Sequence, residues 1–269
     1  MGKLSLKEKF IAVQKEVPLE EYQGKKGNIL VIAPHPDDDI LGAGGTMAEA
    51  ADQGRGVFSV YVTDGRGSPR KNKNISDDEM AALRQKEALS ALQVIGAVGG
   101  FFLNRRSNEL AGEKGREAEE ILAEIIKYIF PEEVYLPAPY ERHRTHQHCT
   151  RLSIESLRAV PGLKPILLGY SLWGSFWGGR QRVVRDVGPF IRKKVEAVLA
   201  HSSQIDYKNY HQGILGKNNC EAIFWESHEM QKNEFVEIYL DMTELLEYKE
   251  MTLETFICQD VKAFMAAFL

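Results

Sequence analysis

The chain has 269 residues, of which 43% are hydrophobic and 27% charged, and its formal net charge is −4. This composition is typical of a globular protein with enough apolar residues to bury a sizeable core. A mildly acidic chain with dispersed Lys and Arg gives no indication of a nucleic-acid partner, and no apolar run approaches the roughly 18 residues that a membrane span needs.

The cysteines and the N-terminal residues predict a reducing, cytoplasmic environment. Cys149, Cys220 and Cys258 are far apart, odd in number and form no CxxC pair. This spacing argues against a disulfide framework and against a thiolate metal site. The first ten residues are charged and lack the apolar core of a signal peptide.

Apolar runs alternate with helical periodicity through the first 160 residues. After a mixed, charged segment (1–27) that could begin with a helix, residues 28–33 form an uninterrupted apolar run, as in a strand buried on both faces of a parallel sheet. Ser76 and Glu79 form a capping-box pattern at the start of a helix. This alternation favours a parallel α/β sheet with right-handed crossovers. The predicted strands are 28–33, 57–62, 101–103 and 134–136, and the predicted helices are 41–53, 76–95, 117–130 and 150–160.

The last third of the sequence is less regular. We expect one domain over 1–269, with a core at 28–160 and a C-terminal part at 161–269 that packs on the main sheet and walls off a pocket. The C-terminal part is predicted to contain strands at 165–172 and 235–240, a Gly/Trp-rich loop at 173–179, and helices at 187–200 and 252–268.

Three consecutive carboxylates follow the first predicted strand, in the sequence Pro-His-Pro-Asp-Asp-Asp at 34–39. Ligands of open α/β sheets bind beyond the carboxyl ends of the strands, and a cation would relieve the repulsion between the acids. His35 and Asp38 are three residues apart, so a turn can direct both at one ion, and imidazole with carboxylate is common zinc chemistry. The plainer alternative is that the acids only cap a helix. The flanking histidine and prolines favour a metal site.

A cluster of histidines follows the fourth predicted strand. His143, His146 and His148 are three of the seven histidines and fall within six residues. One of these rings can complete a His-Asp-His site with a coordination position left for water, and another can act as an acid or stabilise an oxyanion. The chain contains no HExxH, which excludes a helix-borne protease site.

These motifs resemble the PIG-L/LmbE-like family of zinc-dependent N-acetylglucosaminyl de-N-acetylases. That family carries A-H-P-D-D-E after its first strand and H-x-x-H after a later one, which here read 34–39 and 143–146. Supporting matches are Thr-Asp-Gly at 63–65, Arg84 with Glu87 and Ala88, and His-Ser-Ser-Gln at 201–204. The resemblance implies a Rossmann-like, mostly parallel sheet flanked by helices, in an LmbE-like deacetylase domain.

The resemblance also implies an activity and residue roles. The expected reaction removes an N-acetyl group from an amino sugar or amino-sugar conjugate by a metal-activated water. His35, Asp38 and His146 would bind one Zn²⁺ per chain. Asp37 would be the general base that activates the water, and His143 would assist the tetrahedral intermediate and the leaving amine.

The candidate substrate-binding residues are Arg84, Asp39 and Trp173. Arg84 could hold a sugar hydroxyl or an anionic substituent, or could simply pair with Glu87 one turn away. Trp173, with Trp177, could form a stacking surface for a sugar or belong to the core. Asp39 replaces the usual Glu of the family.

Two further departures concern the substrate. Ser107 stands where many members of the family have an Asp that helps to hold the sugar, and Glu141 stands where some members have a Tyr.

Two other functions remain open from the sequence. The acids at 37–39 could hold magnesium for phosphoryl transfer, although hard-oxygen sites need few histidines. The chain could also be a non-catalytic sugar-binding protein on the same scaffold. A homo-oligomer is compatible with the sequence.

Overall fold

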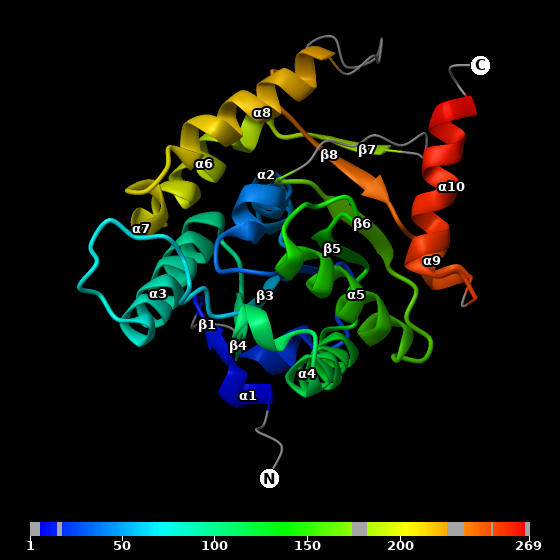
Figure 1. Cartoon of the computed structure of the whole chain (residues 1–269), viewed down its shortest axis with the longest axis horizontal. Coiled ribbons are helices and arrows are strands. Elements are labelled where there is room, and N and C mark those ends of the chain that lie inside the picture. Colours follow the sequence, from blue (N-terminus) through cyan, green and yellow to red (C-terminus); the bar gives the residue numbers. More distant parts are fainter. Residues whose placement is uncertain (1–5, 15–17, 174–181, 225–233, 249, 267–269) are drawn as a thin grey trace.

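The computed structural model describes residues 6–14, 18–173, 182–224, 234–248 and 250–266 (Figure 1). The strands are β1 (Phe10–Ala12), β2 (Ile29–Ala33), β3 (Val57–Thr63), β4 (Gly99–Arg105), β5 (Glu133–Pro137), β6 (Ile166–Tyr170), β7 (Arg182–Asp186) and β8 (Val236–Asp241). The helices are α1 (Leu6–Lys9), α2 (Asp38–Asp52), α3 (Asp77–Ile95), α4 (Glu113–Ile129), α5 (Arg144–Arg158), α6 (Ile191–Leu199), α7 (Ser202–Ile205), α8 (Tyr210–Phe224), α9 (Glu244–Glu247) and α10 (Leu253–Ala266).

The strands form one sheet in the order β1-β4-β3-β2-β5-β6-β8-β7. The five central strands, from β4 to β6, are parallel, whereas β1, β8 and β7 pair antiparallel to their neighbours. The parallel strands β2 and β5 are buried at every position, as expected for strands with both faces covered. The predicted Rossmann-like α/β fold is therefore confirmed, with an antiparallel strand at each edge.

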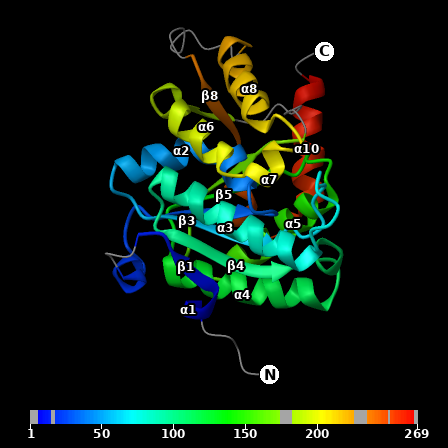
Figure 2. The same cartoon turned by 90° about the vertical axis from the view of Figure 1, so that its left-hand side faces the viewer.

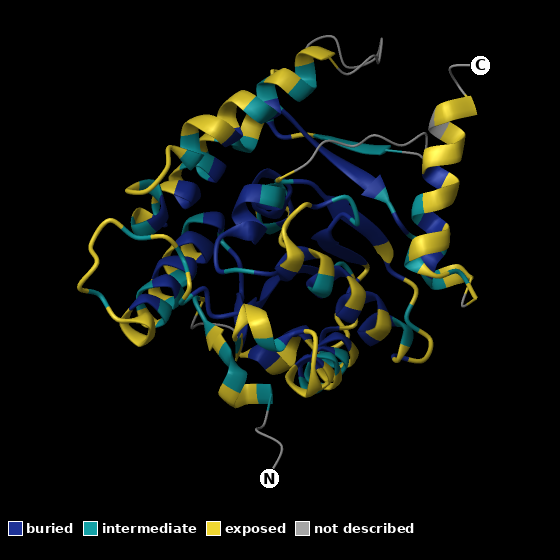
Figure 3. Cartoon of the chain, in the orientation of Figure 1, coloured by how far each residue is buried: buried dark blue, intermediate teal, exposed yellow. Residues whose placement is uncertain are grey.

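Helices cover both faces of the sheet (Figures 1 and 2). Alternate residues of β2 face opposite layers: Leu30 and Ile32 pack with α4 and α5, and Ile29 and Val31 pack with α2, α3 and α6. This is the period of two that a strand imposes on its side chains. Coloured by burial, the sheet and the inner helix faces are dark, and exposed residues lie on the outer faces (Figure 3). Among the described residues, no helix is both long and apolar enough to cross a membrane.

Most of the predicted elements are present. Ser76 caps α3 in a capping box with Glu79, as the pattern indicated. The C-terminal part is more regular than expected, because β7 and β8 extend the central sheet and α8 packs on α6 and β8. Helix α5 begins at Arg144 rather than near residue 150, because its first turn carries the polar histidine cluster, which lacks the apolar periodicity that marks a helix.

Helix α2 is broken near its start. Ala43 has non-helical backbone angles, so a short first turn precedes a second helical segment. The free N–H groups of Gly45 and Thr46 donate to the carboxylate of Glu237 on β8, at 2.9 and 2.8 Å. Glu237 is buried and also accepts a hydrogen bond from Nζ of buried Lys194, at 2.6 Å. A side-chain carboxylate from β8 thus caps the second segment of α2.

Candidate metal centre and active site

The turn between β2 and α2 directs His35 and Asp38 at one another. The backbone N–H of His35 donates to Asp38 Oδ2 at 2.9 Å, and the ring Nδ1 of His35 lies 2.9 Å from the same oxygen. Asp37 occupies the N-cap position of α2 and points its carboxylate elsewhere, toward Arg84. The three consecutive acids therefore have different surroundings.

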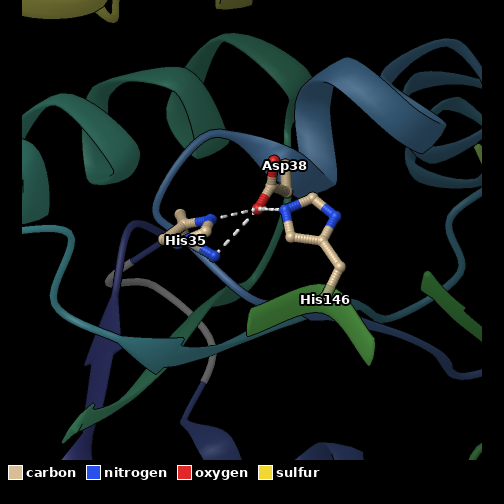
Figure 4. A group of neighbouring side chains, drawn as sticks. All are labelled: His35, Asp38 and His146. Atoms are coloured by element: carbon tan, nitrogen blue, oxygen red, sulfur yellow. Dashed lines mark hydrogen bonds and ion pairs between the residues drawn. The ribbon is translucent and has the colours of Figure 1, made fainter. Parts of the chain in front are cut away.

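The third member of the group comes from α5. His146 Nε2 lies 3.2 Å from Asp38 Oδ2, so His35, Asp38 and His146 converge from two strand ends (Figure 4). One candidate ligand atom from each residue lies within 4.8 Å of the others. His148 is not a member of this group in the described part of the chain.

The donor set fits a metal ion. His146 is fully buried, and neither of its ring nitrogens makes a well-aligned hydrogen bond to a described residue, although each lies near a carboxylate oxygen. A buried polar group without a hydrogen bond is costly. Coordination by a cation would satisfy Nε2, and two imidazoles with one carboxylate are common zinc ligands.

Asp38 and Glu141, the two carboxylates beside His146, raise the pKa of its imidazole. Burial lowers the pKa of His146, but attraction to Asp38 and Glu141 outweighs burial and raises this pKa to about 10. Burial raises the pKa of Asp38, yet His146 and then His35 bring it well below its ordinary value. The carboxylate is therefore held ionised, as a ligand must be, and a cation would replace the proton on His146.

His143 stands at the mouth of the group as the N-cap residue of α5. Its ring centre lies 5.1 Å from that of His35 and 5.0 Å from that of His146. Burial and then the neighbouring imidazoles His35 and His146 lower the pKa of His143. A neutral, partly exposed imidazole beside a cation site can donate or accept a proton there.

Asp37 is held by a buried arginine. Arg84 Nη2 lies 2.6 Å from Asp37 Oδ1, and Arg84 Nη1 donates to the hydroxyl of Ser68. The alternative reading of the sequence, a salt bridge between Arg84 and Glu87, is not what the structure shows. The Glu87 carboxylate instead accepts hydrogen bonds from the Ser202 hydroxyl and from the backbone and hydroxyl of Ser203.

A cavity of about 330 Å³ opens onto these groups. Trp173 lies on its wall, with its ring at an edge-to-face angle to Tyr210, 6.4 Å away between centres, and about two-fifths exposed. Three residues after position 160, Trp173, Gln204 and Tyr210, line the cavity, and Trp177 lies outside the described residues. The lining residues are His35, Asp37, Asp38, Leu41, Gly65, Gly67, Ser68, Pro69, Arg84, Ser107, His143, Thr145, Trp173, Gln204 and Tyr210.

Asp39 is not brought to this cavity. Its side chain is fully buried, and Oδ2 accepts hydrogen bonds from the hydroxyls of Ser59 and Tyr61, both at 2.6 Å. Burial raises the pKa of Asp39 to about 6, against the lowering effect of these two hydrogen bonds. Its contacts join the first turn of α2 to β3, so in this structure Asp39 supports the fold and does not line the cavity.

Glu141 entered the sequence analysis only as a departure from the Tyr of some family members, and no role was predicted for it. Its side chain is completely buried, and Oε2 lies 3.1 Å from Nδ1 of His146. The only signal in the sequence is its position two residues before His143, because its partners depend on how a distant loop folds. Glu141 therefore joins the site as a neighbour of His146, outside the group of His35, Asp38 and His146.

Comparison with known proteins agrees with this geometry. Residues 30–157 match the PIG-L family, described as GlcNAc-PI de-N-acetylase. The chain is 27% identical over 190 residues to diacetylchitobiose deacetylase of Thermococcus kodakarensis, covering 65% of this chain and 69% of that protein. It is 25% identical over 187 residues to a probable N-acetyl-α-D-glucosaminyl L-malate deacetylase 2 of Bacillus anthracis, covering 67% and 83%.

A solved structure is similar as well. The N,N'-diacetylchitobiose deacetylase of Pyrococcus horikoshii, in complex with an inhibitor, superposes with a TM-score of 0.68 at 25% identity, over 86% of this chain and 88% of that chain. The matched family segment begins within β2 and ends within α5, so it contains both halves of the His-Asp-His group. Residues 30–157 therefore form a PIG-L family domain, and the chain is similar to the deacetylases named above.

Proposed function

We propose that this protein is a metal-dependent hydrolase that removes the acetyl group from an N-acetylated amino sugar or its conjugate. The observation that carries the proposal is the group of His35, Asp38 and His146 at the base of a cavity that Asp37 and His143 also line. The similarity to sugar deacetylases supports the choice of substrate.

Zinc is the metal that this donor set favours, because two imidazoles and one carboxylate leave a coordination position open. When bound, such a cation supplies Lewis acidity, which polarises the amide carbonyl and makes a coordinated water more acidic. Magnesium would prefer a site built from oxygen donors, so the two histidines also weigh against phosphoryl transfer.

The chain supplies the proton transfers. Asp37 lines the cavity next to the ligands, and its ion pair with Arg84 fixes the direction of the carboxylate. Asp37 can take a proton from the attacking water. His143, whose ring lies edge-on to that of His35, can donate a hydrogen bond to the oxygen on which charge develops. It can also pass to the departing amine the proton that Asp37 took from the water.

The cavity suits a sugar unit. Its volume of about 330 Å³ is at the lower end of the range for small-molecule sites. Trp173 and Tyr210 give one wall an aromatic character, and the hydroxyl and amide groups of Ser68, Ser107 and Gln204 line other parts. Apolar ring faces with nearby hydrogen-bonding groups match the alternating surface of a pyranose. A hexosamine acetamide is the substrate we infer.

The proposal is tested by measuring acetate release from a panel of N-acetylated mono- and disaccharides, acetylated amino acids and phosphoesters. Activity is expected on at least one amino sugar. Removal of the metal with a chelator should abolish this activity, and added Zn²⁺ or Co²⁺ should restore it. Full activity in metal-free protein, or turnover of phosphoesters without turnover of any amino sugar, would contradict the proposal.

A further inference from the structure

Glu141 connects two parts of the site that are far apart in the sequence. It lies in the segment between β5 and α5 and is 1% exposed. Oε2 lies 3.1 Å from His146 Nδ1, and Oε1 accepts hydrogen bonds from the backbone N–H groups of Leu172 and Trp173, at 2.6 and 3.1 Å. One carboxylate thus contacts the back of a metal ligand and the chain that carries the aromatic wall.

A second carboxylate next to the group would offset the charge of a bound cation. A divalent cation bound by Asp38 and two neutral imidazoles would leave one net positive charge in a buried place. Asp37 does not cancel it, because Asp37 is already paired with Arg84. Glu141 is the adjacent carboxylate among the described residues whose ionised form neutralises this charge, and an uncompensated buried charge is strongly unfavourable.

The contact also selects a tautomer. Nε2 of His146 faces Asp38 and the other ligands, so its lone pair must be free for the metal, and the ring proton must then be on Nδ1. A carboxylate oxygen 3.1 Å from Nδ1 favours the proton on that nitrogen, restrains the ring orientation and makes Nε2 a better donor to the metal. Any group that donates to Nδ1 would instead favour the proton on Nε2, where it would block the metal.

We propose that Glu141 is a positioning residue, which holds His146 in its metal-binding tautomer and fixes the Leu172–Trp173 backbone against the same site. The inference rests on the proposed metal-dependent function. It assigns to Glu141 a role that neither the motifs at 34–39 and 143–146 nor the ligand group itself contains. It also implies that metal binding and the position of the aromatic wall are linked through one side chain.

Glu141→Gln separates these two tasks. Its amide oxygen can still accept the N–H groups of Leu172 and Trp173, and only the longer 3.2 Å contact from Trp173 N–H to Oε2 is lost, but its amide nitrogen would then face Nδ1 as a donor. We expect Zn²⁺ affinity to fall about 10–100-fold, with KM for the sugar near the wild-type value when the metal is saturating. Glu141→Ala removes both contacts, so it should lose a similar amount of metal affinity and also raise KM.

The measurement is Zn²⁺ affinity by competition with a chromophoric chelator, together with the visible absorption spectrum of the Co²⁺-substituted protein. Glu133→Gln is the matched control, because Glu133 is a mostly buried glutamate at the opposite end of β5, where it pairs with Arg55. Glu133→Gln should keep the wild-type affinity and spectrum. Glu141→Asp retains the charge at a shorter reach and should lie between wild type and Glu141→Gln.

The outcomes are distinguishable. Wild-type protein that binds neither Zn²⁺ nor Co²⁺ overturns the proposed metal-dependent function itself. A wild type that binds metal, with Glu141→Gln and Glu141→Asp at wild-type affinity and spectrum, overturns only the role of Glu141. Equal losses in Glu133→Gln would assign the effect to general destabilisation and would also overturn it. If Glu141→Gln does not fold, the comparison of Glu141→Asp with Glu133→Gln decides.

Discussion

Arg84 and Asp37 form a nearly enclosed ion pair, with Arg84 Nη2 2.6 Å from Asp37 Oδ1. Arg84 comes from α3 and Asp37 from the turn after β2, and the hydroxyl of Ser68 holds the other guanidinium nitrogen. The proposed base is therefore oriented by a helix and a loop that contribute nothing to the group of metal ligands. This separation of base and ligands makes their roles testable one by one.

Removing Arg84 from its ion pair with Asp37 should lower the turnover of the enzyme without loss of the metal. Arg84→Met keeps the unbranched apolar stem of the side chain and removes the guanidinium, so Asp37 is free to rotate toward the cation site. Misplacing a catalytic group by about 1 Å can cost about 100-fold in rate, and we expect a decrease in kcat/KM of that order. Arg70→Met, which removes an arginine paired with exposed Asp77, is the control. Wild-type kcat/KM in Arg84→Met would rule out the orienting role.

The ligand assignment predicts two kinds of inactive variant. Asp38→Ala and His146→Ala each remove one of three ligands and should lose the metal. Asp37→Ala should retain the metal and lose about 10²–10⁴-fold in turnover, because the water loses its base. Metal content is measured beside kcat for each purified variant. An empty Asp37→Ala protein with a loaded Asp38→Ala protein would reverse the two assignments.

His143 is expected to act on the reaction rather than on metal binding. His143→Ala should keep its metal and lower kcat by about 10²–10³-fold, the usual effect of removing one donor to a developing oxyanion. His148→Ala is the matched control, since His148 lies on the same helix but outside the ligand group. The assignment fails if His143→Ala loses metal, or if His148→Ala loses as much activity.

Asp39 gives a prediction for stability and pH. Its pKa rises from 3.8 in the unfolded chain to about 6 in the folded protein. The folded state thus binds the proton more tightly, so this group favours folding below about pH 4, and the advantage disappears as the pH rises through 6. A shift of two units corresponds to about 3 kcal/mol. Asp39→Asn cannot ionise, so the unfolding free energy of the variant should vary less between pH 4 and 6 than that of the wild type.

The same variant decides whether Asp39 binds substrate, as the sequence suggested. If Asp39 only joins α2 to β3, KM for the amino sugar should be unchanged in Asp39→Asn. An increase of tenfold or more in KM, with normal metal content, would show that the residue acts on the substrate despite its buried position.

Trp173→Ala should raise KM and leave kcat nearly unchanged, whereas His143→Ala should lower kcat. Trp173→Ala removes an aromatic face from the cavity wall while its backbone N–H can still bond to Glu141. KM should rise about two- to tenfold with kcat little changed, since losing one stacked contact removes about 0.5–1.5 kcal/mol of binding. Tyr207→Ala, an exposed aromatic outside the cavity lining, is the control. An unchanged KM would place the sugar elsewhere in the cavity.

The sequence could predict that His35, Asp38 and His146 meet, because their meeting depends on the order of the strands in the sheet. Parallel neighbours such as β2 and β5 end at the same edge of the sheet, so the residues that follow them must meet there. The spacing of His35 and Asp38 within one turn, and of His143 and His146 on one helix, then leaves few alternatives. The capping of α3 was predictable for a similar reason, because its partners are three residues apart.

The missed features all depend on distant partners. Glu141 is defined by the backbone at Leu172 and Trp173, about thirty residues later, which no local pattern specifies. The inward direction of Asp39 depends on Ser59 and Tyr61, and here a signal existed. These two polar residues share one face of an otherwise apolar strand, which indicates a buried polar partner. The edge strand β7 is only partly buried and carries Arg and Asp, so it lacks the apolar run that marks β2.

The cap that Glu237 places on the broken helix α2 has a consequence for synthesis. The first turn of α2 carries Asp38, and the segment behind it is fixed by a carboxylate about 190 residues further along the chain. While the chain leaves the ribosome, the three proposed metal ligands therefore emerge well before Glu237, the side chain that fixes the helix bearing Asp38. A nascent chain that ends before β8 would contain these three residues without the completed helix cap, so we expect any metal to bind only after β8 has emerged.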